Sequence, residues 1–124
     1  MPGTAVQQAA LGYMHGNCGG CHNDQANIPF DLPQILRLSV GQKTYASTDA
    51  VTTTVGVVVK SMTGAILGKE RIHAVDPTNS AILIRMKDRG NSGLQMPPFG
   101  TNSTKLPDTD GGIKAITDWV NSIQ

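Results

Sequence analysis

Residues 17–23 read NCGGCHN, which places two cysteines three positions apart and a histidine directly after the second one. Cys18 and Cys21 are the only cysteines among the 124 residues of the chain. His22 adds an imidazole to the same short segment. Whatever chemistry uses these two thiols must therefore be completed by His22 or by ligands from distant parts of the sequence.

Three structural or redox roles for the thiols are open, but the sequence disfavours each. A disulfide between Cys18 and Cys21 would close a small, strained ring and would restrain very little of the chain. A thiol redox pair normally lies in a βαβ context, which this sequence does not show. A structural zinc ion needs four ligands, and only His15 and His73 remain to complete that set.

The pattern C-x-x-C-H is the sequence signature of covalent haem attachment. In that chemistry the thiols of Cys18 and Cys21 add to the two haem vinyl groups, and the imidazole of His22 binds the iron as the proximal ligand. The sequence therefore predicts one haem c, with its iron, per chain. Short motifs also occur by chance, so the sixth position of the iron needs separate evidence.

Met96 is the predicted distal ligand. It stands in QMPPFG, inside a segment of residues 90–107 that is dense in Gly, Pro, Ser and Asn. A core role is hard to supply for a methionine in such a polar loop. Pro97 and Pro98 remove two backbone donors and stiffen the chain that would hold the sulfur, and His/Met ligation is a standard cytochrome c arrangement.

The other possible distal ligands are the remaining histidines and methionines, namely His15, His73, Met1, Met14, Met62 and Met86. Met14 lies too close to the cysteines to reach over the haem, and Met1 is terminal. Met86 belongs to an apolar helical stripe, which favours core packing. Either histidine would give bis-histidine ligation, although both are expected to be exposed or simply hydrogen-bonded.

Capping residues and apolar spacing predict three helices. The first starts after Thr4, with Gln7 as its capping-box partner, and leads into Cys18. The second lies within residues 74–90, with Asp76 or Asn79 as its cap. The third follows Asp108 or Asp110. It has Trp119 beside an apolar stripe formed by Ile113, Ile116, Val120 and Ile123.

Two other segments give weaker signals. Residues 31–38, DLPQILRL, suggest a short helical turn. Residues 44–61, TYASTDAVTTTVGVVVKS, are rich in Thr and Val and predict a small β-hairpin, because branched side chains suit a pleated surface. We see no linker that divides the chain, and we expect one domain over residues 1–124.

Composition excludes several classes of function. The net charge of +1 does not indicate a nucleic-acid partner, and no apolar run is long enough to cross a membrane. A basic group in the middle of the chain is expected to be ordinary solvated surface, with a docking patch as the less favoured alternative; it comprises Lys60, Lys69, Arg71, Arg85, Lys87 and Arg89. Only five residues are aromatic, so a buried prosthetic group would relieve a thin core.

The order of these features resembles class I cytochrome c. CGGCH follows an N-terminal helix, MPPFG lies far downstream, and residues 113–124, IKAITDWVNSIQ, are similar to the C-terminal helix of that family. The resemblance implies a mostly α fold in which the N- and C-terminal helices cross around a covalent haem, here with the β-hairpin as an insertion. Residues 76–86, DPTNSAILIRM, also resemble cytochrome modules of larger exported bacterial proteins.

The resemblance implies further contacts of the haem site. His22 should donate its free ring N–H to a backbone carbonyl in the loop after the motif, with Pro29 as the candidate. Partners for the haem propionates would come from Arg37, Arg85 and Trp119, each of which also has an ordinary interpretation as surface charge or core aromatic.

These features predict a one-electron carrier and not an enzyme, because ligation of both axial positions leaves no site for substrate. The alternative is a haem-based gas sensor or a peroxidase-like enzyme with an open distal site. A carrier would be a monomer that docks transiently with redox partners, such as a dehydrogenase, an oxidase or a polysaccharide-oxidising enzyme. Covalent haem attachment in bacteria implies export, so we expect a periplasmic or extracellular protein.

Overall fold

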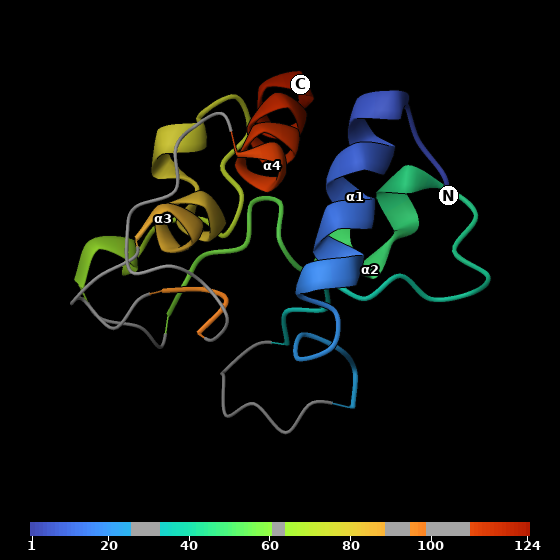
Figure 1. Cartoon of the computed structure of the whole chain (residues 1–124), viewed down its shortest axis with the longest axis horizontal. Coiled ribbons are helices and arrows are strands. Elements are labelled where there is room, and N and C mark those ends of the chain that lie inside the picture. Colours follow the sequence, from blue (N-terminus) through green and yellow to red (C-terminus); the bar gives the residue numbers. More distant parts are fainter. Residues whose placement is uncertain (26–32, 61–63, 89–94, 99–109) are drawn as a thin grey trace.

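Helices dominate the computed structural model, which describes residues 1–25, 33–60, 64–88, 95–98 and 110–124 (Figure 1). The four α-helices are α1 (Ala5–Asn17), α2 (Asp49–Thr52), α3 (Ala81–Lys87) and α4 (Gly111–Ser122). Three short 3₁₀ helices lie between them, at Tyr45–Ser47, Gly64–Ile66 and Pro77–Asn79. The predicted mostly α class is confirmed.

Helix α1 begins where the sequence predicts. The backbone N–H of Gln7 donates to Oγ1 of Thr4 at 3.4 Å, and the N–H of Thr4 donates to Oε1 of Gln7 at 2.8 Å. This reciprocal capping box satisfies two backbone donors that the first turn of a helix otherwise leaves free. The helix then buries Ala10, Leu11 and Met14 against the rest of the protein.

Helix α4 is also capped by a residue that the sequence indicates. The carboxylate of Asp110 accepts hydrogen bonds from the backbone N–H groups of Gly112 and Ile113, at 3.0 and 3.3 Å. Asp108, the other predicted cap, lies outside the residues that the structure describes. The buried face of α4 is formed by Ile113, Ile116, Trp119 and Val120.

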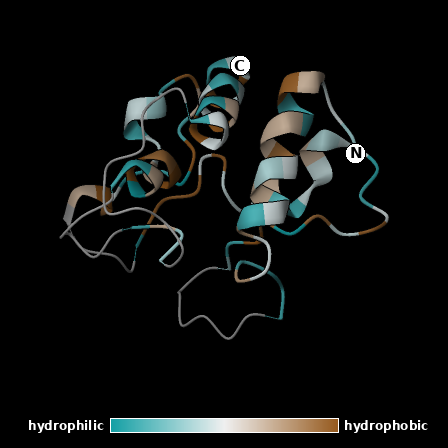
Figure 2. Cartoon of the chain, in the orientation of Figure 1, coloured by the Kyte–Doolittle hydropathy of each residue, from teal (hydrophilic) through white to brown (hydrophobic). Residues whose placement is uncertain are grey.

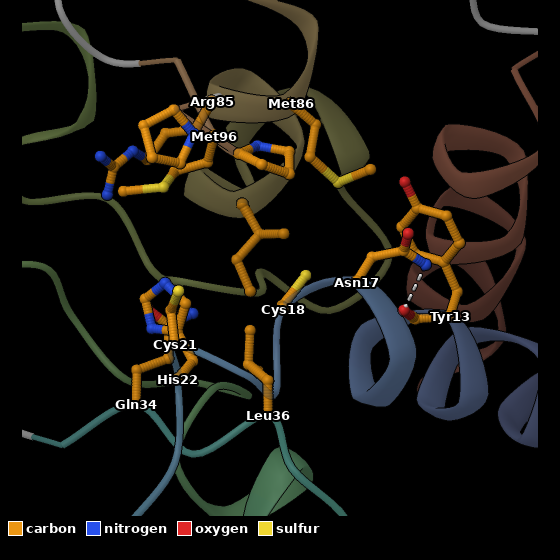
Figure 3. A pocket seen from close by; sticks show the side chains of 13 residues that line it. Tyr13, Asn17, Cys18, Cys21, His22, Gln34, Leu36, Arg85, Met86 and Met96 are labelled. Carbon is orange, nitrogen blue, oxygen red and sulfur yellow. Dashed lines mark hydrogen bonds between the residues drawn. The ribbon is translucent and has the colours of Figure 1, made fainter. Parts of the chain in front are cut away.

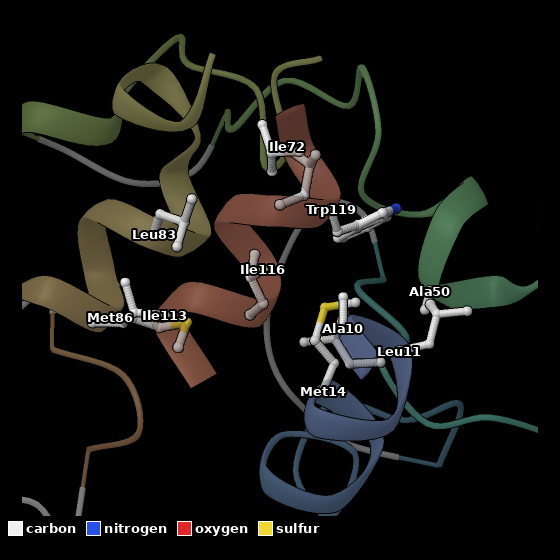
Figure 4. Packing of buried hydrophobic residues seen from close by; sticks show 12 residues of the cluster. Ala10, Leu11, Met14, Ala50, Ile72, Leu83, Met86, Ile113, Ile116 and Trp119 are labelled. Carbon is white, nitrogen blue, oxygen red and sulfur yellow. The ribbon is translucent and has the colours of Figure 1, made fainter. Parts of the chain in front are cut away.

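The two terminal helices pack side by side, and the hydrophobic core forms between them, α2 and α3 (Figure 4). A close approach at Gly112 allows this arrangement, because a Cβ atom at that position would overlap the ring of Tyr13. Trp119 is fully buried, and its indole N–H donates to the hydroxyl of Tyr45 at 2.6 Å. The core therefore joins the two ends of the chain to the segment around residue 45.

The predicted β-hairpin over residues 44–61 is wrong, since no strand occurs in the described part of the chain. Its first half is helical, formed by the Tyr45–Ser47 turn and α2. Its second half, coloured as hydrophobic in Figure 2, does not pair with the first half. It makes only isolated bridges to a later segment, Val55 to Ile72 and Val58 to Glu70.

Local hydrogen bonds of threonine side chains favour helix over strand in the first half of residues 44–61. The hydroxyl of Thr48 donates to the carbonyl of Tyr45 at 2.9 Å, and that of Thr53 donates to the carbonyl of Asp49 at 2.7 Å. Such bonds to carbonyls three or four residues earlier suit a helical turn. Ala50 is fully buried in the core, so tertiary packing overrides the β propensity of Thr and Val.

Two smaller differences concern helix bounds. The described part of the expected turn at residues 31–38 is not helical, and Leu36 is buried there in irregular backbone. The predicted helix at residues 74–90 is split, because Asp76 caps only the Pro77–Asn79 turn and α3 starts after Ser80.

In the described residues, no helix has the length and apolar character needed to span a membrane.

Candidate functional site

A cavity of about 320 Å³ lies between α1, α3 and three irregular segments. Among the described residues, most of the lining is apolar or sulfur-containing, and the one charged residue is an arginine. The lining residues are Tyr13, Asn17, Cys18, Cys21, His22, Gln34, Leu36, Ile82, Arg85, Met86, Met96, Pro97 and Pro98. The four residues predicted for the haem site, Cys18, Cys21, His22 and Met96, are therefore brought together in one cavity.

Figure 3 shows how these four side chains lie. Met96 occupies one side of the cavity beside Arg85, while His22 and Cys21 lie on the opposite side. Cys18 lies between α1 and the interior of the cavity, and both cysteines are free thiols. The imidazole and the thioether thus face each other across a space lined by apolar side chains.

The end of α1 sets the geometry of the cysteine motif. The backbone N–H of Cys18 donates to the carbonyl of Met14 at 2.8 Å, which continues the helix into the motif. The carbonyl of Cys18 then accepts from Cys21 at 3.1 Å and from His22 at 2.8 Å. This tight turn directs all three functional side chains toward the cavity.

His22 lies in a partly buried and electropositive environment. Burial lowers its pKa first, and the nearby charges of Arg85 and Arg71 lower it further. A hydrogen bond to the backbone of Gln34 acts in the opposite direction and raises the pKa, as expected when a ring N–H donates to a carbonyl oxygen. The net direction favours the neutral imidazole, which is the form that binds metals.

The acceptor predicted for the His22 ring, Pro29, lies outside the residues that the structure describes. Among the described residues, Gln34 is a backbone hydrogen-bond partner of this ring, from the segment that follows. The same segment is fixed to the motif by its backbone, because the N–H groups of Leu36 and Arg37 both donate to the carbonyl of His22, at 2.8 and 3.3 Å.

The two thiols differ in their surroundings. Cys21 is exposed, whereas Cys18 is partly buried against the hydrophobic core. Burial raises the pKa of the Cys18 thiol to about 11, and the neighbouring Cys21 adds to this effect. The raised pKa of Cys18 disfavours the thiolate, which is the form that ligates metals and takes part in disulfide exchange.

Met96 is attached to α3 through its backbone. Its N–H donates to the carbonyl of Arg85 at 3.2 Å, and the side chain of Gln95 donates to the carbonyl of Pro97 at 3.2 Å. Met86, the alternative methionine, is buried as predicted and packs in the hydrophobic core, although it also touches the cavity. Met62 lies outside the described residues.

His15 and His73 are both exposed and lie away from the cavity lining, as expected. Nδ1 of His15 accepts a hydrogen bond from the backbone of Leu38 at 3.0 Å, and Nδ1 of His73 lies 3.2 Å from Oε2 of Glu70. Within the described residues, no group of three or more His, Cys, Asp or Glu side chains is arranged to hold a metal ion. The zinc alternative therefore lacks its ligand set there.

The predicted propionate partners separate into different environments. Arg85 lines the cavity, Arg37 is exposed, and Trp119 is buried with its N–H bound to Tyr45. The interpretation of Arg71 as solvated surface is wrong. It is only 8% exposed, and its guanidinium donates to two backbone carbonyls.

Sequence reasoning missed three features of the site. Gln34 and Leu36 line the cavity from a segment expected to be helical, and Ile82 lines it from the apolar stripe of α3. Only the apolar stripe of α3 gave a signal that could have placed Ile82 inside the cavity.

Comparison of the chain with known protein families, curated proteins and solved structures finds no match. The interpretation of the site therefore depends on its own residues and geometry.

Proposed function

We propose that the protein carries one covalently attached haem c and transfers single electrons. Cys18 and Cys21 would hold the haem through thioether bonds, His22 would be the proximal ligand and Met96 the distal ligand. The proposal includes the class I cytochrome c fold that the sequence resembles. Haem supplies an iron that accepts and releases one electron.

The observation that carries this proposal is the opposition of His22 and Met96 across one cavity (Figure 3). The cysteine motif alone is a short pattern, whereas Met96 lies 74 positions further along the chain than His22. Chance would rarely bring a soft thioether opposite the imidazole of this motif. The electropositive neighbourhood of His22 also favours its neutral, ligating form.

The remaining lining residues have roles that fit this function. Leu36, Ile82 and Met86 exclude water from the cavity, which favours the iron state of lower charge and so a positive reduction potential. The guanidinium of Arg85 provides a cation for an anionic group at the cavity edge. The stiff Pro97 and Pro98 backbone limits movement of the Met96 sulfur.

Such a carrier would dock transiently with a donor and an acceptor, and it would work as a monomer outside the cytoplasm. Its partners would be redox proteins such as a dehydrogenase, an oxidase or a polysaccharide-oxidising enzyme. The chain could also work as a module of a larger secreted protein. It would not be an enzyme in its own right.

Absorption spectroscopy of the purified protein tests the proposal. We expect sharp bands after reduction, no response to carbon monoxide, and a weak sulfur-to-iron band in the ferric form. Met96→Ala should abolish that ferric band and allow carbon monoxide to bind. Met86→Leu is the matched control, because it changes a neighbouring methionine of the same cavity and should leave the ferric band in place.

A colourless protein would reject haem attachment. Ready binding of carbon monoxide by the unaltered protein would instead indicate an open iron, as in a gas sensor or a peroxidase-like enzyme. If the ferric band were lost in Met86→Leu and survived in Met96→Ala, Met86 and not Met96 would be the distal ligand.

A further inference from the structure

We propose that Arg71 and Thr53 are positioning residues for the proximal ligand. Together they clamp residues 33–35, and so they hold the carbonyl of Gln34 against the imidazole of His22. This inference rests on the proposed function, since it assigns a role to the clamp in controlling a haem ligand. It concerns residues that neither line the cavity nor belong to the cysteine motif.

Arg71 provides the first half of the clamp. Its Nη1 lies 2.9 Å from the carbonyl oxygen of Pro33 and 2.7 Å from that of Thr53. Arg71 is only 8% exposed, and a buried guanidinium is costly unless hydrogen bonds satisfy it. The two carbonyls repay part of this cost, and in doing so they fix the distance between residues 33 and 53.

Thr53 provides the second half. Its hydroxyl oxygen accepts a hydrogen bond from the backbone N–H of Ile35 at 3.0 Å. The hydroxyl proton is directed to the carbonyl of Asp49 at 2.7 Å, which anchors the side chain to α2. The backbone around Gln34 is therefore held at residue 33 by Arg71 and at residue 35 by Thr53.

The segment is fixed on its other side by the motif itself. The backbone N–H of Leu36 donates to the carbonyl of His22 at 2.8 Å. Gln34 thus lies between two anchors, and its backbone has little freedom to move away from the imidazole with which it is hydrogen-bonded. The clamp acts on His22 through Gln34.

Arg71 also connects the two walls of the cavity. Its backbone carbonyl accepts from the N–H of Ile82 at 3.1 Å, near the start of α3, and its own N–H donates to Val57 at 2.8 Å. Helix α3 carries Ile82, Arg85 and Met86 into the cavity. One residue therefore ties the wall that holds the distal ligand to the segment that orients the proximal ligand.

The chemical consequence concerns the imidazole. A ring N–H that donates to a fixed carbonyl keeps one nitrogen protonated and leaves the other free to bind iron. The bond also raises the electron-donating strength of the ligand, which stabilises the ferric state. Loosening the clamp should weaken the bond, expose the ring proton to solvent and raise the reduction midpoint.

The experiment measures hydrogen exchange of the His22 ring N–H by NMR in the reduced, haem-loaded protein. In Thr53→Val, which changes no charge, exchange should be about tenfold faster, as expected for loss of one supporting hydrogen bond. Thr52→Val is the matched control, because Thr52 is the exposed neighbour on α2 and should leave exchange unchanged. Thr53→Ser retains the hydroxyl and should restore slow exchange.

Arg71 is tested in the same way, with Arg71→Gln accelerating ring-proton exchange and Arg71→Lys restoring it in part. Lys60→Gln removes a surface charge and serves as the control. The reduction midpoint gives a second reading, which should rise in Thr53→Val and not in Thr52→Val. If Arg71→Gln does not fold, the Thr53 variants still test whether the clamp controls the His22 ring proton.

Unchanged ring-proton exchange and midpoint in a haem-loaded Thr53→Val protein would overturn the inference while leaving electron transfer intact. A protein without haem would instead overturn the proposed function. The clamp would then be judged by backbone amide exchange of Ile35 and Leu36, which should still accelerate in Thr53→Val and stay unchanged in Thr52→Val.

Discussion

Gly19 and Gly20, the two residues between the cysteines, occupy different surroundings. A Cβ atom on Gly19 would lie 2.7 Å from the backbone oxygen of His15 and 3.0 Å from Cα of Arg37. Both neighbours are backbone atoms, so they cannot move aside as a flexible side chain would. A Cβ atom on Gly20 would meet nothing within 4 Å.

We therefore expect opposite outcomes for the two alanine variants. Gly19→Ala should push the motif away from the 33–37 segment, destabilise the protein by about 1–3 kcal/mol and weaken the hold on His22. Gly20→Ala should stay within about 0.5 kcal/mol of the unaltered protein. Denaturant unfolding of the purified proteins measures both, and equal stability of the two variants would contradict the crowding at Gly19.

At the scale of single residues, the sequence could name the candidate site residues best where they belong to one short motif. Cys18, Cys21 and His22 lie within five consecutive residues, so one motif names all three. Met96 could be selected because its polar, proline-rich surroundings gave it no core role. Arg71 and Gln34 could not be found, since their roles depend on backbone carbonyls and ring positions that only tertiary structure brings together.

Among the elements, the packing of α1 on α4 depends on one small residue. Gly112 is buried at the N-terminal end of α4, where an added Cβ atom would overlap the ring of Tyr13. The adjacent Gly111 is exposed and has open space around it. Alanine substitutions at these two neighbouring glycines therefore compare a crowded position with an open one in the same helix.

Gly112→Ala should separate the two terminal helices and destabilise the protein by about 1–3 kcal/mol, because overpacking of a close contact forces both helices to shift. Gly111→Ala should be neutral or stabilise the protein by up to about 1 kcal/mol, since alanine favours helix over glycine. Thermal unfolding of the purified proteins provides the comparison. A stable Gly112→Ala protein would show that the helices do not depend on this contact.

Prediction of the elements succeeded where the signal was local. Thr4 and Asp110 cap α1 and α4 through hydrogen bonds to residues two or three positions away, and such bonds can be inferred from sequence spacing. The hairpin failed for the opposite reason. The valines after α2 bridge to residues 70 and 72 and not to the preceding threonines, and nothing in the local composition indicates that partner.

On the scale of the whole molecule, the core and the cavity share their walls. Met86 packs in the hydrophobic core and lines the cavity, and so does Leu36. A haem in the cavity would add apolar contacts to these side chains and so increase the hydrophobic contribution to folding. A group that binds only the native state stabilises it by mass action, so haem attachment and folding should be coupled.

The double variant Cys18→Ala/Cys21→Ala tests this coupling, because it removes both predicted attachment points. We expect it to lose at least about 4 kcal/mol of unfolding free energy and to unfold gradually instead of in one cooperative step. Circular dichroism during denaturant unfolding measures both. Cys21→Ala alone is the control, since this exposed side chain contributes little packing and Cys18 would still tether the haem.

The graded series separates two causes of instability. If the loss came from missing thiol packing alone, the double variant would lose only what Cys18, the partly buried thiol, contributes to the core. A cooperative transition at the unaltered midpoint in the haem-free double variant would mean that the helices and their core fold independently of the cofactor. Loss of cooperativity only when both thiols are absent would instead identify the haem as part of the core.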